Sequence, residues 1–546
     1  MVMMLYTAFF AGIIDIVHIP INLVSLGIGN ILFSAGLCIY SFKTKKIQKY
    51  KFSWFDLCAL LIFAILTVVI AVSQFGFNLN MNYETTDPSR HIRMAEDIID
   101  TQDIRSMYFG SLFNSVIITI GLGFFKSFWA YKLFILADIL MFLLSGCIMY
   151  CAARLYAKKT VQKVLSIVFI VYYLLCYPLN NMVFGFVYLG MGVSICAYLL
   201  MMSQCYKNGT INKLASIVLL MLGAYGIIIC YSLFAPFVYV AIALFIAIEF
   251  IKQKRLFSKE FFATQFGIFL IPTVMGLYFS FFGSFGGQVS AVGSSIGLEG
   301  YIYRDLYSNF IIILPFVIYG LVNAFITKKV RCHHIFLLIL GAAVLVMFWF
   351  GMQGKVSSYY YYKMYYLLWM VCFVVAIEGI CELCKKSATV IISYVLVWVF
   401  MAFMNFGKID DKITEKRVLM SPSSWSSGAF FPIIEFNLNC MKEVNFTLER
   451  VQLYEEAHNK FTAGNKITLL NTTEPIYWFE SFVQCTLEEF YCYDFNACDI
   501  DAYMSNIEES CDYVVVHTEH DTRFDEYISK WEPIYQNADG TIYSIK

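Results

Sequence analysis

Long apolar runs, each about the length of a membrane-crossing helix, recur along the first 405 residues. A helix needs about 20 apolar residues to cross about 30 Å of hydrocarbon. The sequence therefore predicts about twelve spans, with the apolar stretch before Pro20 as a thirteenth or as an interfacial helix. The predicted spans cover 21–42, 54–75, 127–153, 164–181, 184–204, 212–232, 234–251, 260–282, 307–327, 333–351, 360–384 and 388–405. We expect a mainly α-helical, polytopic membrane domain over 1–405.

Positive charges gather in alternate short loops, as the positive-inside rule requires of cytoplasmic loops. They lie at 43–51, 154–163, 252–255, 328–331 and 385–386. Alternation then puts 76–126, 283–306, 352–358 and everything after 405 on the outer face. The segment 107–125 is apolar, but a crossing there would reverse every later loop. We therefore expect it to be re-entrant or interfacial.

The composition changes after Phe406. Residues 406–546 carry 11 Lys and Arg against 24 Asp and Glu, so their net charge is −13 and that of residues 1–405 is +13. An acidic domain argues against nucleic acid as a partner. The pattern predicts a small outer α/β domain, in which five cysteines would permit two disulfides. We expect helices over 446–461, 474–482, 501–509 and 521–531, strands over 466–470 and 512–518, and a hairpin over 533–544.

The whole chain is 60% hydrophobic and 14% charged, which excludes an ordinary soluble enzyme. Six acidic residues nevertheless fall between Glu84 and Asp103 in the first outer loop. Asp87 followed by Pro88 is typical of a helix start, and Asp87 and His91, four apart, share one face of that helix. An interfacial helix with merely solvated acids would explain the same residues.

Lys363 is the second unusual charge, because it sits one turn inside an otherwise uncharged span. The tyrosines around it, Tyr360 included, are expected of an aromatic belt at a membrane interface. An ionisable residue inside a span is a functional candidate by default. The alternative is a lysine that extends its ammonium group to the outer interface.

Three stretches together resemble the GT-C superfamily of membrane glycosyltransferases. They are Thr86–His91, the apolar and aromatic run Met107–Leu112, and the span Leu133–Tyr156 with its basic end. The resemblance implies transfer of a sugar from a polyprenyl-phosphate donor, on the outer face and with inversion at the anomeric carbon. It also implies that the C-terminal domain helps to bind the acceptor, which would be a cell-envelope glycan, lipid or protein.

The resemblance also suggests roles for particular residues. A carboxylate takes the proton of the acceptor hydroxyl, and Asp87 is the predicted base. Cations stabilise the charge that grows on the leaving phosphate. The predicted substrate-binding residues are Glu84, Arg90, His91, Arg93, Tyr360 and Lys363. We assign no metal ligand and no cofactor besides the lipid-linked sugar, although a divalent metal is compatible with the family.

Other classes of protein remain open. A transporter or flippase would concentrate ionisable residues at the midplane, often in repeated, interrupted helices. An envelope polysaccharide polymerase or ligase would carry its polar residues in a long later outer loop, and 283–306 is short and poor in charge. A non-catalytic scaffold with an outer binding domain would need no acidic loop. The abundance of Phe, Ile, Tyr and Lys favours a bacterial plasma membrane.

Overall fold

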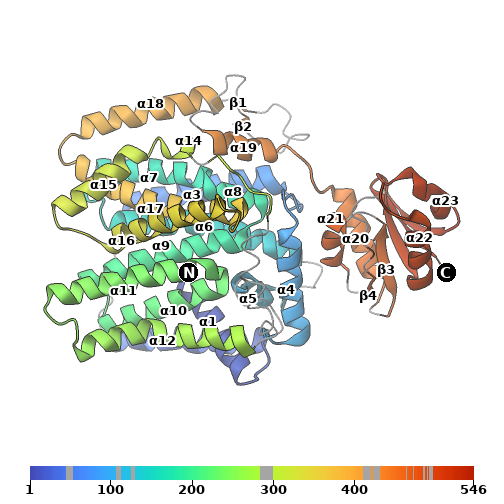
Figure 1. Ribbon diagram of the computed structural model, residues 1–546, viewed down its shortest axis with the longest axis horizontal. Helices are drawn as coiled ribbons and strands as arrows, with labels where there is room; N and C mark the ends of the chain where they lie inside the picture. Colours follow the sequence, from blue (N-terminus) through green and yellow to red (C-terminus); the bar gives the residue numbers. More distant parts are fainter. Residues whose placement is uncertain are drawn as a thin grey trace.

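The computed structural model has a bundle of long helices joined to a smaller domain made by the C-terminal part of the chain (Figure 1). The structure describes all residues except 45–52, 106–111, 124–129, 283–298, 306, 407, 410–419, 422–430, 463, 471–472, 484–485, 489, 491–495 and 546. The predicted outer loop 283–306, the run Met107–Leu112 and the basic cluster at 43–51 therefore lie largely outside the described residues.

Helices cover every predicted span. The described part of the bundle comprises α1 (Val2–Ile16), α2 (Leu23–Thr44), α3 (Trp54–Phe75), α4 (Asp87–Thr101), α5 (Phe113–Leu122), α6 (Ala130–Arg154), α7 (Thr160–Leu175), α8 (Tyr177–Phe184), α9 (Val187–Asn208), α10 (Lys213–Tyr231), α11 (Ala235–Lys252), α12 (Lys259–Phe282), α14 (Tyr307–Phe310), α15 (Leu314–Ile326), α16 (Cys332–Gly351), α17 (Ser358–Leu383) and α18 (Ala388–Phe406).

Within the described ranges, nine helical stretches are long and apolar enough to cross a membrane, which is fewer than the twelve predicted. Two of the predicted spans are short helices, Leu314–Ile326 and Ala388–Met404. The first is short because the predicted span 307–327 is interrupted, and α15 begins anew at Leu314 with a proline in its first turn. The count is lower by one more because the stretch Lys213–Lys252 counts as one apolar segment, whereas two spans are predicted there.

That 40-residue stretch nevertheless folds back on itself. The Tyr239 hydroxyl of α11 donates a hydrogen bond to the Ala224 carbonyl of α10 at 2.7 Å. In one straight helix these residues, fifteen apart, would be separated by about 22 Å. The short 3₁₀ turn Ser232–Phe234 therefore reverses the chain, and α10 and α11 form a helical hairpin as the two predicted spans require.

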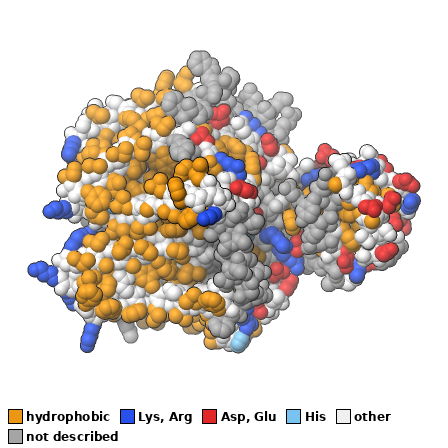
Figure 2. All heavy atoms as spheres, in the orientation of Figure 1, with side chains coloured by type: hydrophobic (Ala, Val, Ile, Leu, Met, Phe, Trp, Pro, Cys, Tyr) orange, Lys and Arg blue, Asp and Glu red, His pale blue; other side chains and the backbone are white. Residues whose placement is uncertain are grey.

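Loops at the two ends of the bundle differ in what they contact. At one end the first loop meets the α8–α9 turn, where the Thr85 hydroxyl donates to the Phe184 carbonyl at 2.6 Å. At the other end Arg331 lies over the ring of Tyr156, 4.5 Å from its centre. Figure 2 shows Lys and Arg side chains at the bundle end farthest from the C-terminal domain. This grouping matches the predicted alternation of loops.

Two short helices occupy the other end. Figure 1 shows α4 running across the ends of the long helices, between the bundle and the C-terminal domain. The neighbouring α5 has ten residues and is thus about 15 Å long, half of the hydrocarbon thickness. A helix of that length does not cross the membrane, as expected for the described part of 107–125.

The C-terminal domain contains α20 (Leu448–Lys460), α21 (Thr473–Glu480), α22 (Ile500–Ser510) and α23 (Asp525–Ile528) around a five-stranded sheet. The strands, in the order β4-β3-β5-β7-β6, are β4 (Thr486–Leu487), β3 (Lys466–Leu470), β5 (Tyr513–His517), β7 (Gly540–Ser544) and β6 (Glu532–Gln536). The β4–β3 and β3–β5 pairs are parallel, whereas β5–β7 and β7–β6 are antiparallel. The predicted helices, strands and hairpin are all present, with short helices over 521–531.

Alternate residues of the central strands build two cores. Leu469 and Val515 pack in the core shared with α20, and Val514 and Val516 pack in the core shared with α22. This period of two is what a sheet covered on both faces requires. Among the described cysteines of 406–546, Cys440 and Cys498 are free thiols.

Two elements of this region were not predicted. A small pair of strands, β1 (Lys408–Ile409) and β2 (Met420–Ser421), follows α18. Helix α19 (Pro432–Cys440) then lies against the bundle, where the Asn180 amide of α8 donates to the Asn437 side-chain oxygen at 2.7 Å. The chain after Phe406 thus first packs on the membrane bundle and then enters the sheet domain.

Candidate functional site

The acidic loop and the charged span meet at the bundle end that carries the C-terminal domain. Asp87 opens α4, with Pro88 in the first turn as the sequence predicts. The hydroxyl of Tyr188, in the first turn of α9, donates to Oδ2 of Asp87 at 2.9 Å. Nζ of Lys363, in the second turn of α17, donates to the same hydroxyl oxygen at 3.4 Å. Three helices distant in sequence therefore build one chain of hydrogen bonds, Lys363–Tyr188–Asp87.

Lys363 does not extend to the interface, because its side chain is 3% exposed. Five rings lie within 6 Å of its ammonium nitrogen, namely those of Phe186, Tyr188, Tyr231, Tyr359 and Tyr360. The centre of the Tyr359 ring is nearest, at 4.0 Å, and that of Tyr360 is at 5.7 Å. Aromatic faces attract a cation, so this box stabilises a charge that would otherwise be poorly solvated in the bundle.

A glycine allows α4 and α9 to approach each other. Gly185, in the turn between α8 and α9, has φ of +74°, a conformation that side chains disfavour. A Cβ atom at this position would lie 2.1 Å from Cγ of Pro88. Gly185 therefore lets the turn pass close to the start of α4, which places Tyr188 within reach of Asp87.

His91 lies one turn after Asp87 and packs against Tyr188, with 4.3 Å between the ring centres. Burial lowers the pKa of His91 to about 4. The nearby Asp87 carboxylate raises this pKa and the Lys363 ammonium lowers it further. His91 is therefore neutral at pH 7, where it offers an uncharged hydrogen-bonding group beside Asp87.

The two predicted arginines have carboxylate partners. Arg90 is exposed and its Nη1 lies 3.3 Å from Oε2 of Glu480 in the C-terminal domain. Arg93 pairs along its own helix, with Nε 3.1 Å from Oδ1 of Asp97 and Nη1 3.7 Å from Oε2 of Glu96. Unlike Lys363, both guanidinium groups are thus already balanced by negative charge.

Glu84 contacts the C-terminal segment, where the Asn445 amide donates to its Oε1 at 3.2 Å. Burial raises the pKa of the Glu84 carboxyl above its usual range. The same Asn445 amide donates to the Tyr83 carbonyl at 3.0 Å, and its backbone N–H donates to the Asn82 side-chain oxygen at 2.9 Å. Glu84 therefore belongs to a joint between the first loop and the C-terminal domain.

Sequence reasoning missed Tyr188 and Tyr359. Each stands at the outer end of a predicted span, where a tyrosine is normally explained by the aromatic belt. The spatial approach of α4, α9 and α17 brings these two tyrosines to Asp87 and Lys363. The charge of Lys363 was the usable signal, because a buried cation requires partners.

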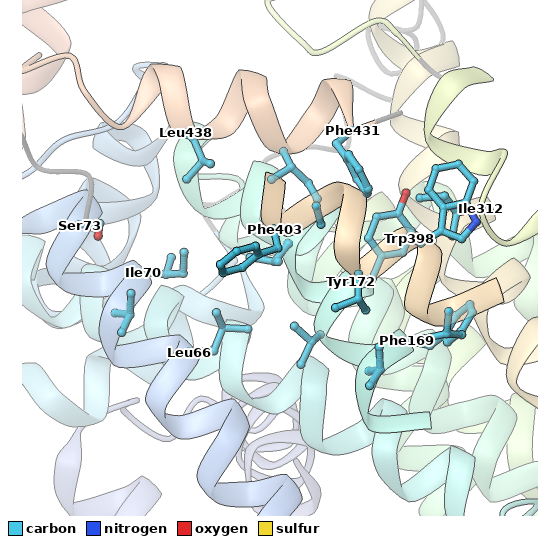
Figure 3. A pocket seen from close by; sticks show the side chains of 18 of the residues that line it. Leu66, Ile70, Ser73, Phe169, Tyr172, Ile312, Trp398, Phe403, Phe431 and Leu438 are labelled. Atoms are coloured by element: carbon cyan, nitrogen blue, oxygen red, sulfur yellow. The ribbon is translucent and has the colours of Figure 1, made fainter. Parts of the chain in front are cut away.

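A separate pocket of about 410 Å³ lies between α3, α7, α18 and α19 (Figure 3). Its walls are almost entirely apolar, with Ser73, Tyr172 and Trp398 as the side chains that carry polar atoms. Such a lining offers contacts to hydrocarbon and none to a charged group. This pocket therefore offers no charged group for acid–base chemistry.

Metal-ligand side chains do not gather around Asp87 in the part of the chain that the structure describes. Among the described residues, side chains that could hold a metal ion gather at His333, His334 and Glu378, near the opposite end of α17. No metal ligand is predicted from the sequence, and these three residues are not among the predicted site residues.

No family model matches the chain, and a comparison with curated proteins gives no match. In three dimensions it is similar to ArnT from Cupriavidus metallidurans bound to undecaprenyl phosphate, with 10% identity, a TM-score of 0.48, and coverage of 89% of this chain and 98% of that chain. It is also similar to the oligosaccharyltransferase of Archaeoglobus fulgidus in the apo form, with 11% identity, a TM-score of 0.48, and coverage of 92% and 75%. These are likenesses of overall layout, and no activity or residue role is carried over from them.

Proposed function

We propose that this chain is an inverting glycosyltransferase that moves a sugar from a polyprenyl-phosphate donor to an acceptor in the cell envelope. The observation that carries the proposal is the chain of hydrogen bonds Lys363–Tyr188–Asp87 at one end of the membrane bundle. The reaction requires a base for the acceptor hydroxyl and positive charge for the leaving phosphate. Asp87 and Lys363 supply these two groups, and Tyr188 fixes their relative positions.

In the proposed reaction the acceptor hydroxyl gives its proton to Asp87 while its oxygen attacks the anomeric carbon. The bond from that carbon to the phosphate oxygen breaks on the opposite face, so the configuration inverts. Oδ2 of Asp87 accepts the Tyr188 hydroxyl, and Oδ1 accepts no hydrogen bond from any described residue. We assign Oδ1 to the acceptor proton.

The leaving polyprenyl phosphate retains the bonding electron pair and gains negative charge. A lysine ammonium stabilises such charge through charge-assisted hydrogen bonds. Lys363 is nearly covered, so the donor phosphate must part the rings of Tyr359 and Tyr360 to reach it. Both tyrosines stand in the first turn of α17, where the chain enters the helix. They are thus well placed to cover the lysine until a phosphate arrives.

The proposal requires Asp87 and the C-terminal domain to lie on the outer face of the membrane. The contacts of Glu84 and Arg90 with the C-terminal segment put both on the same side. A tag after Lys546 should therefore be accessible from outside intact cells, and a tag inserted after Lys46 should not. If the C-terminal tag is found inside the cell, Asp87 lies on the opposite side of the membrane from the predicted donor.

The function itself is tested with purified protein in nanodiscs, polyprenyl-phosphate sugars extracted from membranes, and envelope acceptors. The expected result is free polyprenyl phosphate together with a glycosylated acceptor, both identified by mass spectrometry and absent for Asp87→Asn. Asp100→Asn is the matched control, because Asp100 is an exposed carboxylate on the same helix.

The alternatives give different products. A flippase would move the intact donor between leaflets of a vesicle without cleaving it. A polymerase or ligase would consume a diphosphate-linked oligosaccharide, and a scaffold would change neither substrate. Any of these results, with the polyprenyl-phosphate sugar left uncleaved, would overturn the proposal.

A further inference from the structure

A second polar cluster lies near the end of the bundle opposite the C-terminal domain. His333 and His334 stand in the first turn of α16, and Glu378 stands near the end of α17. Their exposed fractions are 2%, 0% and 4%, so all three side chains are removed from solvent. Nothing in the proposed glycosyl transfer uses them. Three ionisable side chains in so small a buried volume require an explanation of their own.

The ligand atoms of the cluster converge on one point. Nε2 of His333 lies 2.7 Å from Oε2 of Glu378, and Nε2 of His334 lies 3.7 Å from the same oxygen. All three atoms lie within 4.8 Å of one another. Nε2 of His334 is fully buried and has no hydrogen-bond partner. Buried polar atoms usually have a hydrogen-bond partner, so a buried His334 nitrogen that faces the Glu378 carboxylate without one requires an explanation.

We propose that His333, His334 and Glu378 bind a divalent transition-metal ion, with Zn²⁺ as the first choice. Imidazole and carboxylate ligands suit Zn²⁺, whereas Mg²⁺ and Ca²⁺ prefer oxygen alone. Ligand atoms about 2.1 Å from a tetrahedral Zn²⁺ are about 3.4 Å apart. The 3.7 Å gap between His334 and Glu378 is close to that value, and the 2.7 Å hydrogen bond from His333 widens to it when the metal enters.

Two neighbouring groups must adjust when the ion binds. The Arg331 backbone N–H donates to Nδ1 of His334 at 3.1 Å and so caps the helix. When Nε2 binds the metal, the ring proton moves to Nδ1, which can then no longer accept this hydrogen bond. Coordination of the metal therefore takes the place of the helix cap. Nη1 of Arg331 lies 3.3 Å from Oε2 of Glu378. By turning its carboxylate, Glu378 offers one oxygen to the metal and the other to Arg331. Such outer contacts commonly orient a metal-bound carboxylate.

The site would join the start of α16 to the end of α17, on the side that the positive charges predict to be cytoplasmic. It lies 15 residues along α17 from Lys363, or about 22 Å. The inference therefore concerns a site distinct from Asp87. It stands or falls independently of the glycosyltransferase proposal.

The experiment measures zinc in the full-length protein, without an affinity tag, reconstituted in nanodiscs. After treatment with a chelator and dialysis against ZnSO₄, inductively coupled plasma mass spectrometry should find one Zn²⁺ per chain. The chelated protein should melt at a lower temperature than the reloaded protein. Substitution by Co²⁺ should give the visible absorption bands of a four-coordinate site.

His334→Gln is the decisive variant. His334 occupies the third position of α16, where a glutamine side chain can still accept the Arg331 N–H and keep the helix cap. The variant should fold, bind Zn²⁺ about a hundredfold more weakly or worse, and melt at a temperature that the chelator no longer changes. His520→Gln is the matched control, because His520 lies in the C-terminal domain beside Asp525.

Two results would overturn the inference. If the wild-type protein retains less than a tenth of an equivalent of zinc after reloading, the cluster holds no metal. If His334→Gln and His520→Gln bind as much zinc as the wild type and respond equally to the chelator, the metal sits elsewhere. In either case His333, Glu378 and Arg331 form a salt-bridged joint without an ion.

Discussion

Helix α17 carries two buried charged groups that are assembled in different ways. Near its start, Lys363 faces Asp87 through the Tyr188 hydroxyl, and Asp87 is partly exposed. Toward its end, Glu378 is enclosed by His333, His334 and Arg331. The first cluster has opposite charges held apart by a neutral hydroxyl, with Lys363 covered by aromatic rings. The second has its ligand atoms collapsed on one carboxylate oxygen.

The proposed function assigns the first cluster to substrates, and the proposed metal site assigns the second cluster to structure. Opposite charges held apart can act on two different atoms of a substrate, as base and as phosphate-binding group. Side chains closed around one point can satisfy one another or a small ion, but leave no space for a sugar. Changes near Lys363 should therefore affect transfer, and changes near Glu378 should affect stability and metal content.

Among changes to the cluster of Asp87, Tyr188 and Lys363, removal of the Lys363 charge should reduce sugar transfer most strongly after removal of the Asp87 carboxylate. A hydrogen bond to a charged group contributes about 1.5 to 3 kcal/mol, or about tenfold to more than a hundredfold in affinity or rate. Lys363→Met should weaken use of the polyprenyl-phosphate sugar by that factor in a donor titration. Lys355→Met, at an exposed position before α17, is the matched control.

Arg93→Ala sharpens the same comparison. Arg93 is predicted, together with Lys363, to bind the phosphate, but its guanidinium is paired with Glu96 and Asp97. We expect a smaller change in donor dependence than for Lys363→Met. An equal or larger change would mean that Arg93 leaves its partners to bind the phosphate.

Gly185→Ala should disturb the geometry without touching a charge. Its Cβ would meet Pro88 at 2.1 Å, so the start of α4 must move away from Tyr188. Overpacking of this kind destabilises by about 1–3 kcal/mol, and we expect about a tenfold loss of transfer because misplacement weakens catalysis. Zinc content should not change.

The control for that variant is Gly209→Ala. Gly209 has a similar φ of +62°, but a Cβ there would meet nothing within 4 Å. It should melt earlier through backbone strain alone and keep full transfer. Equal loss of transfer in the two variants would show that the approach of α4 to α9 is unimportant.

His91 provides a test by pH. Its pKa of about 4 in the folded protein is below its usual value near 6.5, so the unfolded chain binds the proton first as the pH falls. Folding stability should therefore decrease as the pH falls from about 6.5 to about 4. His91→Gln should flatten this part of a plot of melting temperature against pH, whereas His520→Gln should not. An unchanged slope in His91→Gln would place His91 in solvent.

The contact between Arg90 and Glu480 should have the smallest effect. Exposed ion pairs contribute about 0–1 kcal/mol, and the Arg90 side chain is 62% exposed. Arg90→Ala should raise hydrogen exchange in α21 slightly and leave the membrane helices unchanged. Arg523→Ala, which removes an ion pair within the C-terminal domain, is the control. A large release of the domain would mean that this single pair holds it in place.

Elements with strong local patterns could be predicted from the sequence. The helices over the predicted spans follow from apolar length, and strand β3 occupies 466–470 as predicted. The interruption before Leu314 was less evident, because the run remains apolar through the turn. Hydropathy measures transfer to hydrocarbon and does not register a break that other helices cover.

The candidate sites show a similar division. Asp87, His91 and Lys363 could be proposed because a charge beside or inside a span requires a reason. Tyr188 could not, since a tyrosine at a helix end satisfies the aromatic belt. The partners Glu378 and His333 are 45 residues apart, and Glu378 lies close to loops that are predicted to be cytoplasmic, where a charge is ordinary. Their convergence depends on the packing of α16 on α17, which no local pattern encodes.

The central claim is that Asp87 acts as a base and not as a ligand of the donor. The most direct measurement determines donor binding and single-turnover rate separately for Asp87→Asn, with Asp100→Asn beside it. An amide has nearly the shape of the carboxylate but cannot take a proton, so the rate should fall by about 10²–10⁴ while the donor dissociation constant stays within about threefold. A turnover rate equal to that of Asp100→Asn would contradict the account.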